Sequence, residues 1–547
     1  MAVARYRIQQ VRIGLDDDEA TIRRRLARLL GCPVSQLQAM QCVRRAIDAR
    51  NKRDVHFNCQ YEVELGAPLR RLPEGVAPFT RSRLTPETPA IFRRTLPADE
   101  HVVIVGAGPA GLFAALALAE VGCRVTLLER GKPVESRMRD IGRLRARGAL
   151  DPESNICFGE GGAGTYTDGK LYTRIKHPFV RHVLHQFVRF GADPDILVDA
   201  HPHLGTDKLV RIVRRMRNHL CALGVDYRFE TRVDGLLTRA GKAVGVRTHR
   251  GEEIRATHVI LAIGHSARDT FDRLLAQGIA IEPKPFAVGV RAEHPQALIN
   301  RIQHGRFAAH PRLGAAEYRL THQVADPHLG RRGVYSFCMC PGGLIVPSPT
   351  EPGAMAINGM SNAKRAGRWA NAGIVVQLEP ADLERHGLSR HPLIGIAFQR
   401  ELERATFAAA GDAYAAPAMR ISDFVARRAS GTLAPTRFKP NAVPTDLHAL
   451  MPAWLSQPLV AGVRAFDRKM RGFITEEANL LAMETRTSAP VRLPRDETTM
   501  QSVSLARLYP IGEGAGYAGG IVSAAVDGLK AAARIIDRHA TAPPPAG

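Results

Sequence analysis

The most constraining feature of this chain is "VIVGAGPAGLFAALALAEVGCRVTLLER", residues 103 to 130. An apolar strand runs into a glycine turn, the turn opens an apolar helix, and a second apolar strand follows. Strand, turn, helix and strand within about thirty residues form a βαβ unit, and such a unit requires a parallel sheet. We therefore expect an α/β domain with a Rossmann-like sheet.

The glycines of this turn fit the pattern GxGxxG, at Gly106, Gly108 and Gly111. The first permits a tight turn, the second lets backbone approach a pyrophosphate, and the third lets the helix lie close to the strand. Glu129 stands 23 residues after Gly106 and can accept hydrogen bonds from ribose hydroxyls. An acidic residue there disfavours a 2′-phosphate, so the motif predicts FAD or NAD. The predicted contacts also include Pro109, Ala110 and Arg130.

The order of the later segments distinguishes between these two cofactors. A second glycine loop, "CFGEGGAGTYTDGKL", contains Gly162 and Gly164, and residues 225 to 264 alternate with period two before the apolar strand "VILAIG". This alternation predicts a small antiparallel meander that returns to the main sheet. The stretch "LYPIGEGAGYAGGIVSAAVDG" then places a third glycine loop before the last helix. A nicotinamide dehydrogenase would continue with further βα units, so this order predicts FAD.

Several longer motifs resemble one family. They are "SNICFGEGGAGTYTDGKL", "GVYSFCMCPGG", "NGMS", "ETRTSAPVR" and "YPIGEGAGYAGGIVSAAVDG". With these motifs the chain resembles the two-dinucleotide-binding-domain flavoproteins, and within them the uncharacterised bacterial FAD-dependent dehydrogenases. The resemblance extends from about residue 100 to 535 and is less distinctive over the first hundred residues.

The resemblance implies further cofactor contacts. Val233 corresponds to a position whose backbone meets the adenine, and Ala262 and Gly264 lie at the strand end that passes the phosphates. Glu513 stands where similar flavoproteins usually have an aspartate that bonds a ribityl hydroxyl or phosphate. The last helix would direct its N–H groups at the flavin N1 and O2 edge. The remaining contacts implied are Gly162, Gly164, Gly512, Gly519, Gly520 and Ile521.

Changes in pattern along the chain predict four segments. Residues 1–95 form a small α+β unit with a linker, in the order strand, helix, strand, strand. Residues 96–285 form the first part of an FAD-binding domain with its antiparallel meander. Residues 286–489 form an inserted α+β substrate or cap domain, and residues 490–547 complete the FAD-binding domain and add a tail.

Fewer residues are candidates for catalysis or for contact with substrate, and each of them also has a possible structural role. Cys338 and Cys340 would lie on one side of a strand, as a redox pair, a nucleophile or simply two buried small residues. His265 is either a proton donor near the flavin or a loop hydrogen-bond partner. Arg486 fits an anionic substrate, an FAD phosphate or a structural ion pair. Arg137, just beyond Glu129, is a further candidate for cofactor contact.

Composition limits the possible partners, the cellular location and the chemistry of the cysteines. The net charge of +23 and pI near 10.2 favour anionic partners, but the arginines are scattered at helical spacings and form no recognisable nucleic-acid module. Without a signal sequence or a run of 18 apolar residues, we expect a cytoplasmic protein with no membrane association. Eight irregularly spaced cysteines predict reduced thiols and no zinc or other metal site.

The sequence thus predicts an FAD-dependent oxidoreductase that transfers hydride through a non-covalently bound flavin. NADH or NADPH would be a transient partner, because a second GxGxxG unit is missing. The expected substrate is a small molecule, with an anion as one candidate. Two alternatives remain: a flavin-dependent tRNA-modifying enzyme, suggested by the basic charge, and an FAD-loaded binding or scaffold protein without turnover.

Overall fold

The computed structural model describes residues 4–96, 99–327, 330–411 and 413–539, so the tail from 540 onward lies outside the described residues. Its N-terminal unit is a four-stranded sheet in the order β2-β3-β1-β4 with one helix. Asp18 caps this helix by accepting a hydrogen bond from the Thr21 N–H at 2.8 Å. The predicted order of strand, helix, strand, strand is confirmed, and β4 is an additional strand within the predicted linker. The elements are β1 (Ala4–Gly14), α1 (Glu19–Leu30), β2 (Leu37–Asp48), β3 (His56–Leu65) and β4 (Val76–Pro78).

The central sheet of the main body is parallel and has the order β22-β11-β5-β6-β7. The predicted βαβ unit is confirmed as β5, α2 and β6, and the meander β8-β9-β10 is antiparallel as predicted. This is a Rossmann-like arrangement. The elements are β5 (His101–Val105), α2 (Pro109–Glu120), β6 (Arg124–Leu128), β7 (Asp226–Arg228), β8 (Val233–Arg239), β9 (Lys242–Thr248), β10 (Glu253–Arg255), β11 (His258–Leu261) and β22 (Leu508–Pro510).

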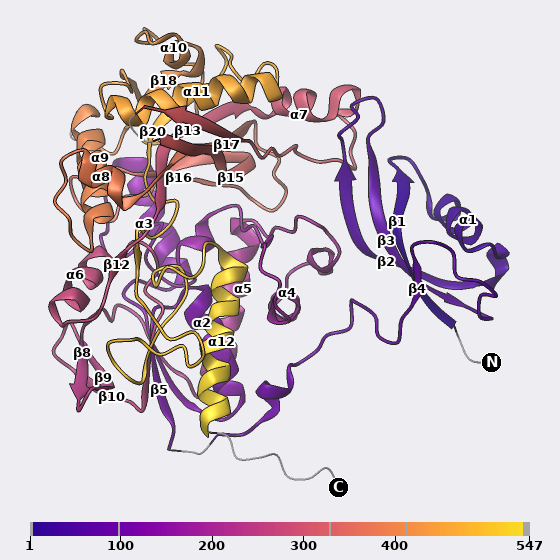
Figure 1. Ribbon diagram of the computed structural model, residues 1–547, viewed down its shortest axis with the longest axis horizontal. Helices are drawn as coiled ribbons and strands as arrows, with labels where there is room; N and C mark the ends of the chain where they lie inside the picture. Colours follow the sequence, from indigo (N-terminus) through magenta and orange to yellow (C-terminus); the bar gives the residue numbers. More distant parts are fainter. Residues whose placement is uncertain (1–3, 97–98, 328–329, 412, 540–547) are drawn as a thin grey trace.

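The two faces of this sheet are covered differently. Val102 and Ile104 of β5 pack with α2, α5 (Thr206–Ala222) and α12 (Ile521–His539), whereas Val103 and Val105 pack with the meander and α6 (Arg268–Ala276). Successive side chains of a strand point to opposite faces, which explains why β5 is an uninterrupted apolar run. Figure 1 shows α12 beside α2, although about four hundred residues separate them in sequence. Two further helices of this part are α3 (Val134–Arg147) and α4 (Phe179–Arg189).

A second large unit is built on an eight-stranded mixed sheet in the order β14-β15-β17-β13-β20-β18-β19, with β16 paired to β15. The helix α11 crosses it in Figure 1. The elements are β13 (Phe286–Pro295), α7 (Gln296–His304), β14 (Thr321–Asp326), β15 (Gly330–Pro347), β16 (Ile357–Met360), β17 (Trp369–Leu378), α8 (Pro380–Arg385), α9 (Ile394–Ala409), β18 (Ala416–Arg420), α10 (Ile421–Ala426), β19 (Ala442–Pro444), α11 (Ala453–Lys469) and β20 (Asn479–Glu484).

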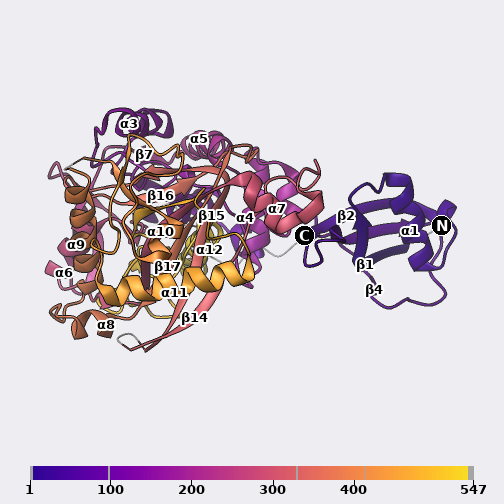
Figure 2. The ribbon, with the colours of Figure 1, turned by 90° about the horizontal axis from the view of Figure 1, so that it is seen from above.

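The connection between the two large units is short. The strands β12 (Glu282–Pro283) and β21 (Val491–Arg492) pair where the chain enters and leaves the eight-stranded sheet. Figure 2 shows the N-terminal unit projecting from one end of the body. Among the described residues, no helix combines the length and the apolar character that crossing a bilayer requires.

Candidate cofactor site

The site is a cavity of about 1170 Å³ at the carboxyl edge of the parallel sheet. Four lining segments directly follow strands: Gly106 follows β5, Glu129 follows β6, Ala262 follows β11, and Ile511 follows β22. Ligands of open α/β sheets bind at this edge. The predicted contacts that line the cavity are Gly106, Gly108, Pro109, Ala110, Glu129, Arg130, Gly162, Gly164, Val233, Ala262, Gly264, Gly512, Glu513, Gly519, Gly520 and Ile521.

The three glycines of the first turn have different environments. A Cβ on Gly106, whose φ is +104°, would lie 2.3 Å from the Ala262 carbonyl oxygen, and one on Gly111 would lie 1.9 Å from the Gly106 oxygen. Both positions therefore require glycine for packing, and Gly111 does not line the cavity. A Cβ on Gly108 would meet only the Gly162 Cα, at 3.8 Å. Gly108 is thus the glycine that keeps space open inside the cavity.

This space fits the pyrophosphate of FAD. Gly108 and Gly162 face each other, and a Cβ on Gly162 would come within 3.0 Å of the Gly108 Cα. No side chain caps the N-terminus of α2, so the first N–H groups of that helix are available for phosphate oxygens. The two facing glycines thus leave a narrow space, and the uncapped helix start supplies N–H donors at its edge.

Glu129 has a structural task in addition to the predicted one. Its side chain is 5 % exposed. Oε1 accepts hydrogen bonds from the N–H groups of Gly131 at 2.9 Å and Gly159 at 3.0 Å, and Oε2 accepts one from Ala107 at 2.9 Å. The carboxylate therefore ties the two glycine loops together. Since Oε2 accepts only one of these three bonds, it retains a lone pair that can accept a ribose hydroxyl.

Arg137 does not line the cavity, so the prediction that it contacts the cofactor is wrong. The side chain is 0 % exposed, and its guanidinium donates to five backbone carbonyls between residues 155 and 162. It also stacks on Tyr166 at 4.7 Å from the ring centroid. Arg137 instead holds the second glycine loop in shape, because carbonyl oxygens satisfy all of its nitrogens.

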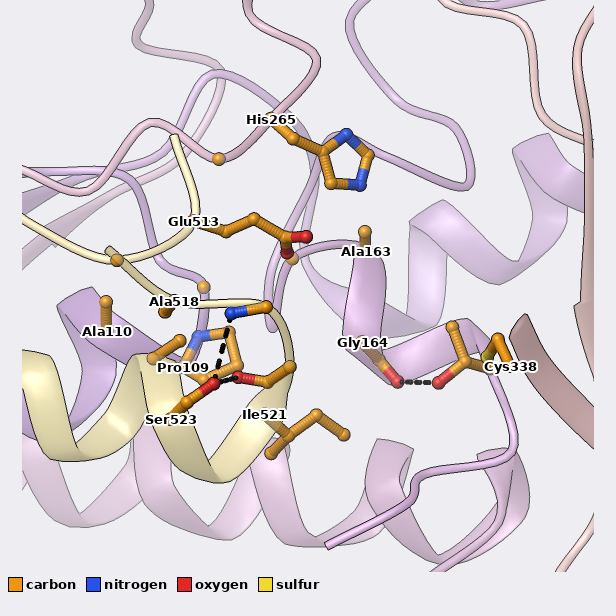
Figure 3. Close-up of a pocket in the computed structure, with 18 of the residues that line it drawn as sticks. Pro109, Ala110, Ala163, Gly164, His265, Cys338, Glu513, Ala518, Ile521 and Ser523 are labelled. Atoms are coloured by element: carbon orange, nitrogen blue, oxygen red, sulfur yellow. Dashed lines mark hydrogen bonds between the residues drawn. The ribbon is translucent and has the colours of Figure 1, made fainter. Parts of the chain in front are cut away.

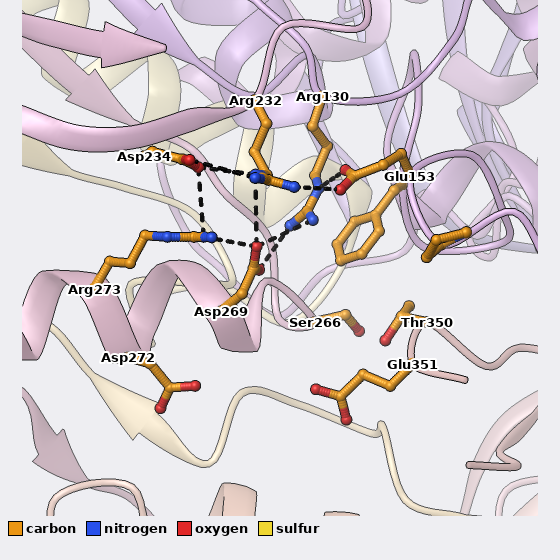
Figure 4. A network of polar contacts seen from close by, with 12 residues as sticks. Arg130, Glu153, Arg232, Asp234, Ser266, Asp269, Asp272, Arg273, Thr350 and Glu351 are labelled. Atoms are coloured by element: carbon orange, nitrogen blue, oxygen red, sulfur yellow. Dashed lines mark hydrogen bonds and ion pairs between the residues drawn. The ribbon is translucent and has the colours of Figure 1, made fainter. Parts of the chain in front are cut away.

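Arg130 lies at the edge of the cavity within a network of ion pairs (Figure 4). It pairs with Glu153 at 2.7 Å and with Asp269 at 2.9 Å, and its guanidinium lies 4.1 Å from the centroid of the Phe158 ring. Arg232 also pairs with Glu153, at 2.7 Å. Carboxylates thus neutralise both arginines. The network positions the loop around Phe158 and leaves Arg130 without a free charge for phosphate.

The N-terminus of α12 opens into the same cavity as that of α2 (Figure 3). The Ser523 hydroxyl accepts from the Gly519 N–H at 3.2 Å and donates to the Gly520 carbonyl at 2.9 Å, which shapes the entrance of the helix. A Cβ on Gly528 would lie 2.1 Å from the Ala110 carbonyl oxygen, so α12 lies directly against α2. Two helix N-termini therefore converge on one cavity.

Glu513 points into the middle of this cavity (Figure 3). Burial raises the pKa of its carboxyl to about 8, although the nearby Lys284 ammonium acts in the opposite direction. The group is consequently protonated at neutral pH and can donate a hydrogen bond as well as accept one. This arrangement suits a contact with a ribityl hydroxyl or a phosphate oxygen.

The two cysteines lie on an irregular part of β15. Cys338 has φ +41° and the register shifts between Phe337 and Cys340, so the strand alternation that would place both on one side is broken. Cys338 lines the cavity, whereas Cys340 is 0 % exposed behind it. The strand is therefore irregular at this point, and a β-bulge gives the two side chains different exposure although their thiols remain neighbours.

His265 and Arg486, the other two candidates for catalysis or substrate contact, also line the cavity. His265 Nδ1 lies 2.7 Å from the Ser266 hydroxyl, and burial with the charges of Arg486 and Arg268 lowers its pKa to about 4. The imidazole is thus neutral at pH 7. Arg486 forms a buried ion pair with Glu403 at 2.8 Å, which is the structural alternative that the sequence left open.

A group of charged side chains in the cavity wall was not predicted. Asp168 is paired with Lys170 at 2.8 Å and with Arg365 at 2.5 Å, and Arg365 also approaches Glu317 at 3.6 Å. These pairs join the end of the second glycine loop to the eight-stranded unit. The motif "DGKL" contains Asp168 and Lys170, but their partners come from distant residues and local spacing could not identify them.

Comparison with protein-family models identifies three segments. Residues 285–487 match "FAD-dependent protein, C-terminal domain-like", residues 99–146 match "FAD binding domain", and residues 5–64 match a domain of unknown function, DUF8436. The models define the class: the chain is an FAD-dependent protein, and its cofactor is FAD.

A relative from Clostridium beijerinckii, named only as an uncharacterized protein, is 38% identical over 541 residues, which cover 97% of this chain and 98% of the relative. The chain belongs to the same family as that protein. The protein FixC of Escherichia coli K12 is 29% identical over 225 residues, covering 39% of this chain and 47% of FixC.

Solved structures align only loosely. CtdE in complex with FAD is 13% identical with a TM-score of 0.30, covering 80% of this chain and 84% of CtdE. The GidA-related protein from Thermus thermophilus is 20% identical with a TM-score of 0.22, covering 35% of this chain and 73% of that protein. At these scores the alignments do not establish a shared fold, and the assignment of FAD depends on the family models and the cavity.

Proposed function

We propose that this protein is an FAD-dependent oxidoreductase, of the bacterial FAD-dependent dehydrogenase type, which transfers hydride through a non-covalently held flavin. The observation that carries the proposal is the convergence of the N-termini of α2 and α12 on one cavity. The opposite wall of this cavity comes from β15 and β16 of the eight-stranded sheet. A site with a cofactor side and a separate opposing wall can hold a flavin and a second molecule together.

Each part of the cavity has a proposed role in binding. The N–H groups at the start of α2 would hold the pyrophosphate in the space between Gly108 and Gly162, and Glu129 Oε2 would accept a ribose hydroxyl. Val233 lies at the adenine end. The start of α12, which lines the same cavity, would hold the flavin end, where the positive end of the helix dipole would stabilise added electron density. FAD itself supplies the hydride chemistry, and the residues bind and orient it.

The substrate side lies toward β15, where Tyr335, Ser336 and Phe337 line the cavity. Lys170 and Arg365 stand at the same wall with charges partly balanced by Asp168. We propose a small-molecule substrate, and an anionic group would be recognised here by these two cations. The described residues contain one GxGxxG βαβ unit, so a nicotinamide donor would have to reach the flavin through this cavity.

The test is purification of the full chain and flavin spectroscopy with a panel of donors. We expect a yellow protein whose visible flavin absorption is bleached by NADH, NADPH or another organic hydride donor. A colourless protein that cannot be reconstituted with FAD would contradict the assignment of this cavity as an FAD site. A protein that holds FAD but is not reduced by any donor would favour a scaffold role over an enzyme.

A further inference from the structure

The segment of β15 around Cys338 and Cys340 is the most unusual part of the cavity wall. Cys338 has a positive φ of +41°, a conformation that non-glycine residues rarely adopt. The register with β17 shifts on either side of Cys340. Strained backbone and bulges are commonly found where a side chain is aimed at a ligand. Here the bulge directs Cys338 into the FAD cavity and leaves Cys340 buried directly behind it.

The two thiols lie close enough to interact. Each thiol shifts the pKa of the other, and the Cys340 thiol donates a hydrogen bond to the Cys338 carbonyl oxygen at 3.3 Å. The buried Arg291 organises this turn, since its Nη2 donates to the Cys338 carbonyl at 2.7 Å and to the Cys340 Sγ at 3.6 Å. Glu484 balances the Arg291 charge at 2.9 Å. Arg291 therefore fixes both cysteines in one arrangement.

The environments of the two sulfurs differ in a way that gives them different roles. The Cys340 thiol, Arg291 and Lys170 lower the pKa of Cys338 against the opposing effect of burial, which favours its thiolate. Its neighbour Cys338 and burial raise the pKa of Cys340 well above its ordinary value. Thiolates are the nucleophiles of thiol chemistry. The pair thus consists of an accessible nucleophile and a buried thiol behind it.

We propose that Cys338 and Cys340 form a redox-active dithiol that exchanges two electrons with an external disulfide at the cavity. The Cys338 thiolate attacks one sulfur of the disulfide and releases one thiolate, which takes a proton from solvent. The Cys340 sulfur then attacks Cys338, forms the internal disulfide and expels the second thiol, which carries the Cys340 proton.

Return to the dithiol form requires two electrons and one proton, which restore one thiolate and one thiol. The two-electron reduced cofactor could supply both electrons and the proton, because Cys338 lines the same cavity as the start of α12. The inference therefore rests on the proposed function and narrows it to a reaction partner of the disulfide class. Loss of the dithiol and loss of the FAD site must therefore give different experimental results.

A second pair of cysteines serves as an internal control. Cys42 on β2 and Cys59 on β3 also shift each other's pKa, but they belong to the N-terminal sheet and do not line the cavity. Cys157 lines the cavity without a cysteine partner in the hydrogen bonds described. Any oxidation that involves these residues in place of Cys338 and Cys340 contradicts the proposal.

The first experiment counts electrons in the FAD-loaded, oxidised protein by anaerobic titration with dithionite. We expect about four electrons per flavin in the wild type, two for FAD and two for the disulfide. Cys338→Ser and Cys340→Ser should each take about two, and Cys42→Ser should still take about four. A wild-type value of two with bound flavin would overturn the dithiol and leave the proposed function intact.

The second experiment does not depend on flavin. The full chain is equilibrated with mixtures of reduced and oxidised glutathione, its free thiols are alkylated, and its peptides are analysed by mass spectrometry. We expect one disulfide between Cys338 and Cys340, and a glutathione adduct on Cys338 in Cys340→Ser. A disulfide in a protein that cannot bind FAD would support the dithiol while the proposed function fails. Retention of both free thiols at every ratio would overturn the dithiol.

Discussion

At the scale of single residues, glycines of one motif have separate physical duties. Gly106 and Gly111 exclude a side chain because backbone oxygens lie about where a Cβ would stand. Gly108 faces the cavity and a Cβ there meets no protein atom closer than 3.8 Å. A substitution at Gly108 should therefore affect the cofactor and spare the fold, which distinguishes a binding glycine from a packing glycine.

Gly108→Val tests this distinction. The new side chain would occupy the cradle between α2 and Gly162, so we expect the Kd for FAD to rise at least about 100-fold. The thermal unfolding of the FAD-free protein should change little. Gly142→Ala is the matched control, since a Cβ at that position meets no atom within 4 Å. Full retention of FAD by Gly108→Val would contradict the position of the pyrophosphate.

Glu513 provides a prediction about pH. Its pKa in the folded protein is about 8, above the ordinary value of 4.5. Between these values the folded state holds a proton that the unfolded state has lost, so the contribution of Glu513 to stability falls as pH rises through this window. In FAD-free protein, the melting temperature of Glu513→Gln minus that of the wild type should increase as pH rises from about 5.5 to about 8.5. The reason is that glutamine does not titrate, so only the wild type loses this contribution.

The control for this pH series is Glu497→Gln, an exposed position in the same segment. Its melting temperature should follow the wild type at every pH. If the difference between Glu513→Gln and wild type does not grow with pH, the carboxyl of Glu513 is ionised in the folded protein and the assignment of its protonation state is wrong.

At the scale of elements, the contact between α2 and α12 decides the geometry of the site. The two helices begin at different glycine loops, and Gly528 lets them approach until a Cβ would lie 2.1 Å from the Ala110 oxygen. The loop before α12 is held as well, since Asp527 accepts from the Gly512 N–H at 2.8 Å and pairs with Arg495 at 2.7 Å. The relative position of the two helix N-termini thus depends on a few close contacts.

Gly528→Ala should move these helices apart. Overpacking of this kind costs about 1–3 kcal/mol of unfolding free energy. FAD affinity should fall together with stability, because both N-termini bind the same cofactor. Urea unfolding and FAD titration measure the two effects. Arg534→Ala, on the exposed side of α12, should change neither, and a Gly528→Ala protein of wild-type stability would contradict the close approach.

At the scale of the whole molecule, a buried ion network joins three distant segments beside the cavity. Glu403 on α9 pairs with Arg268 on α6 at 2.8 Å and with Arg486 of the returning chain at 2.8 Å. Glu403 is completely buried. Burial alone would raise the pKa of Glu403, but the two guanidinium groups outweigh it and lower that pKa, so the carboxylate is ionised. The network connects the eight-stranded unit to the parallel-sheet unit.

Glu403→Ala should leave two buried guanidinium groups without this partner. Loss of one member of a buried pair typically costs about 3–5 kcal/mol. We expect a decrease of this size in the unfolding free energy, measured with urea at pH 7. Glu401→Ala, two residues away on the exposed face of α9, is the control. A loss below about 1 kcal/mol would mean that water replaces the partner, and the network would not join the two units.

The sequence alone determined the βαβ unit, the meander, the N-terminal strand order and the glycines at the cavity. These features depend on local periodicity and on backbone conformations that only certain residues adopt, so a short window contains the necessary information. The segment from residue 285 to 490 was predicted only as a mixture of strands and helices. Its sheet pairs strands that are distant in sequence, and local patterns do not specify such pairing.

The tertiary structure decided the roles of the charged and sulfur side chains. The Arg137 guanidinium binds carbonyls of the second glycine loop, Arg486 pairs with Glu403, and a bulge exposes Cys338 to the cavity while Cys340 stays buried. A guanidinium or a thiol can serve many partners, and its function depends on which distant groups the fold brings within about 3 to 4 Å. Glycine patterns locate the cavity because their constraint is local, whereas the chemistry of its walls exists only after folding.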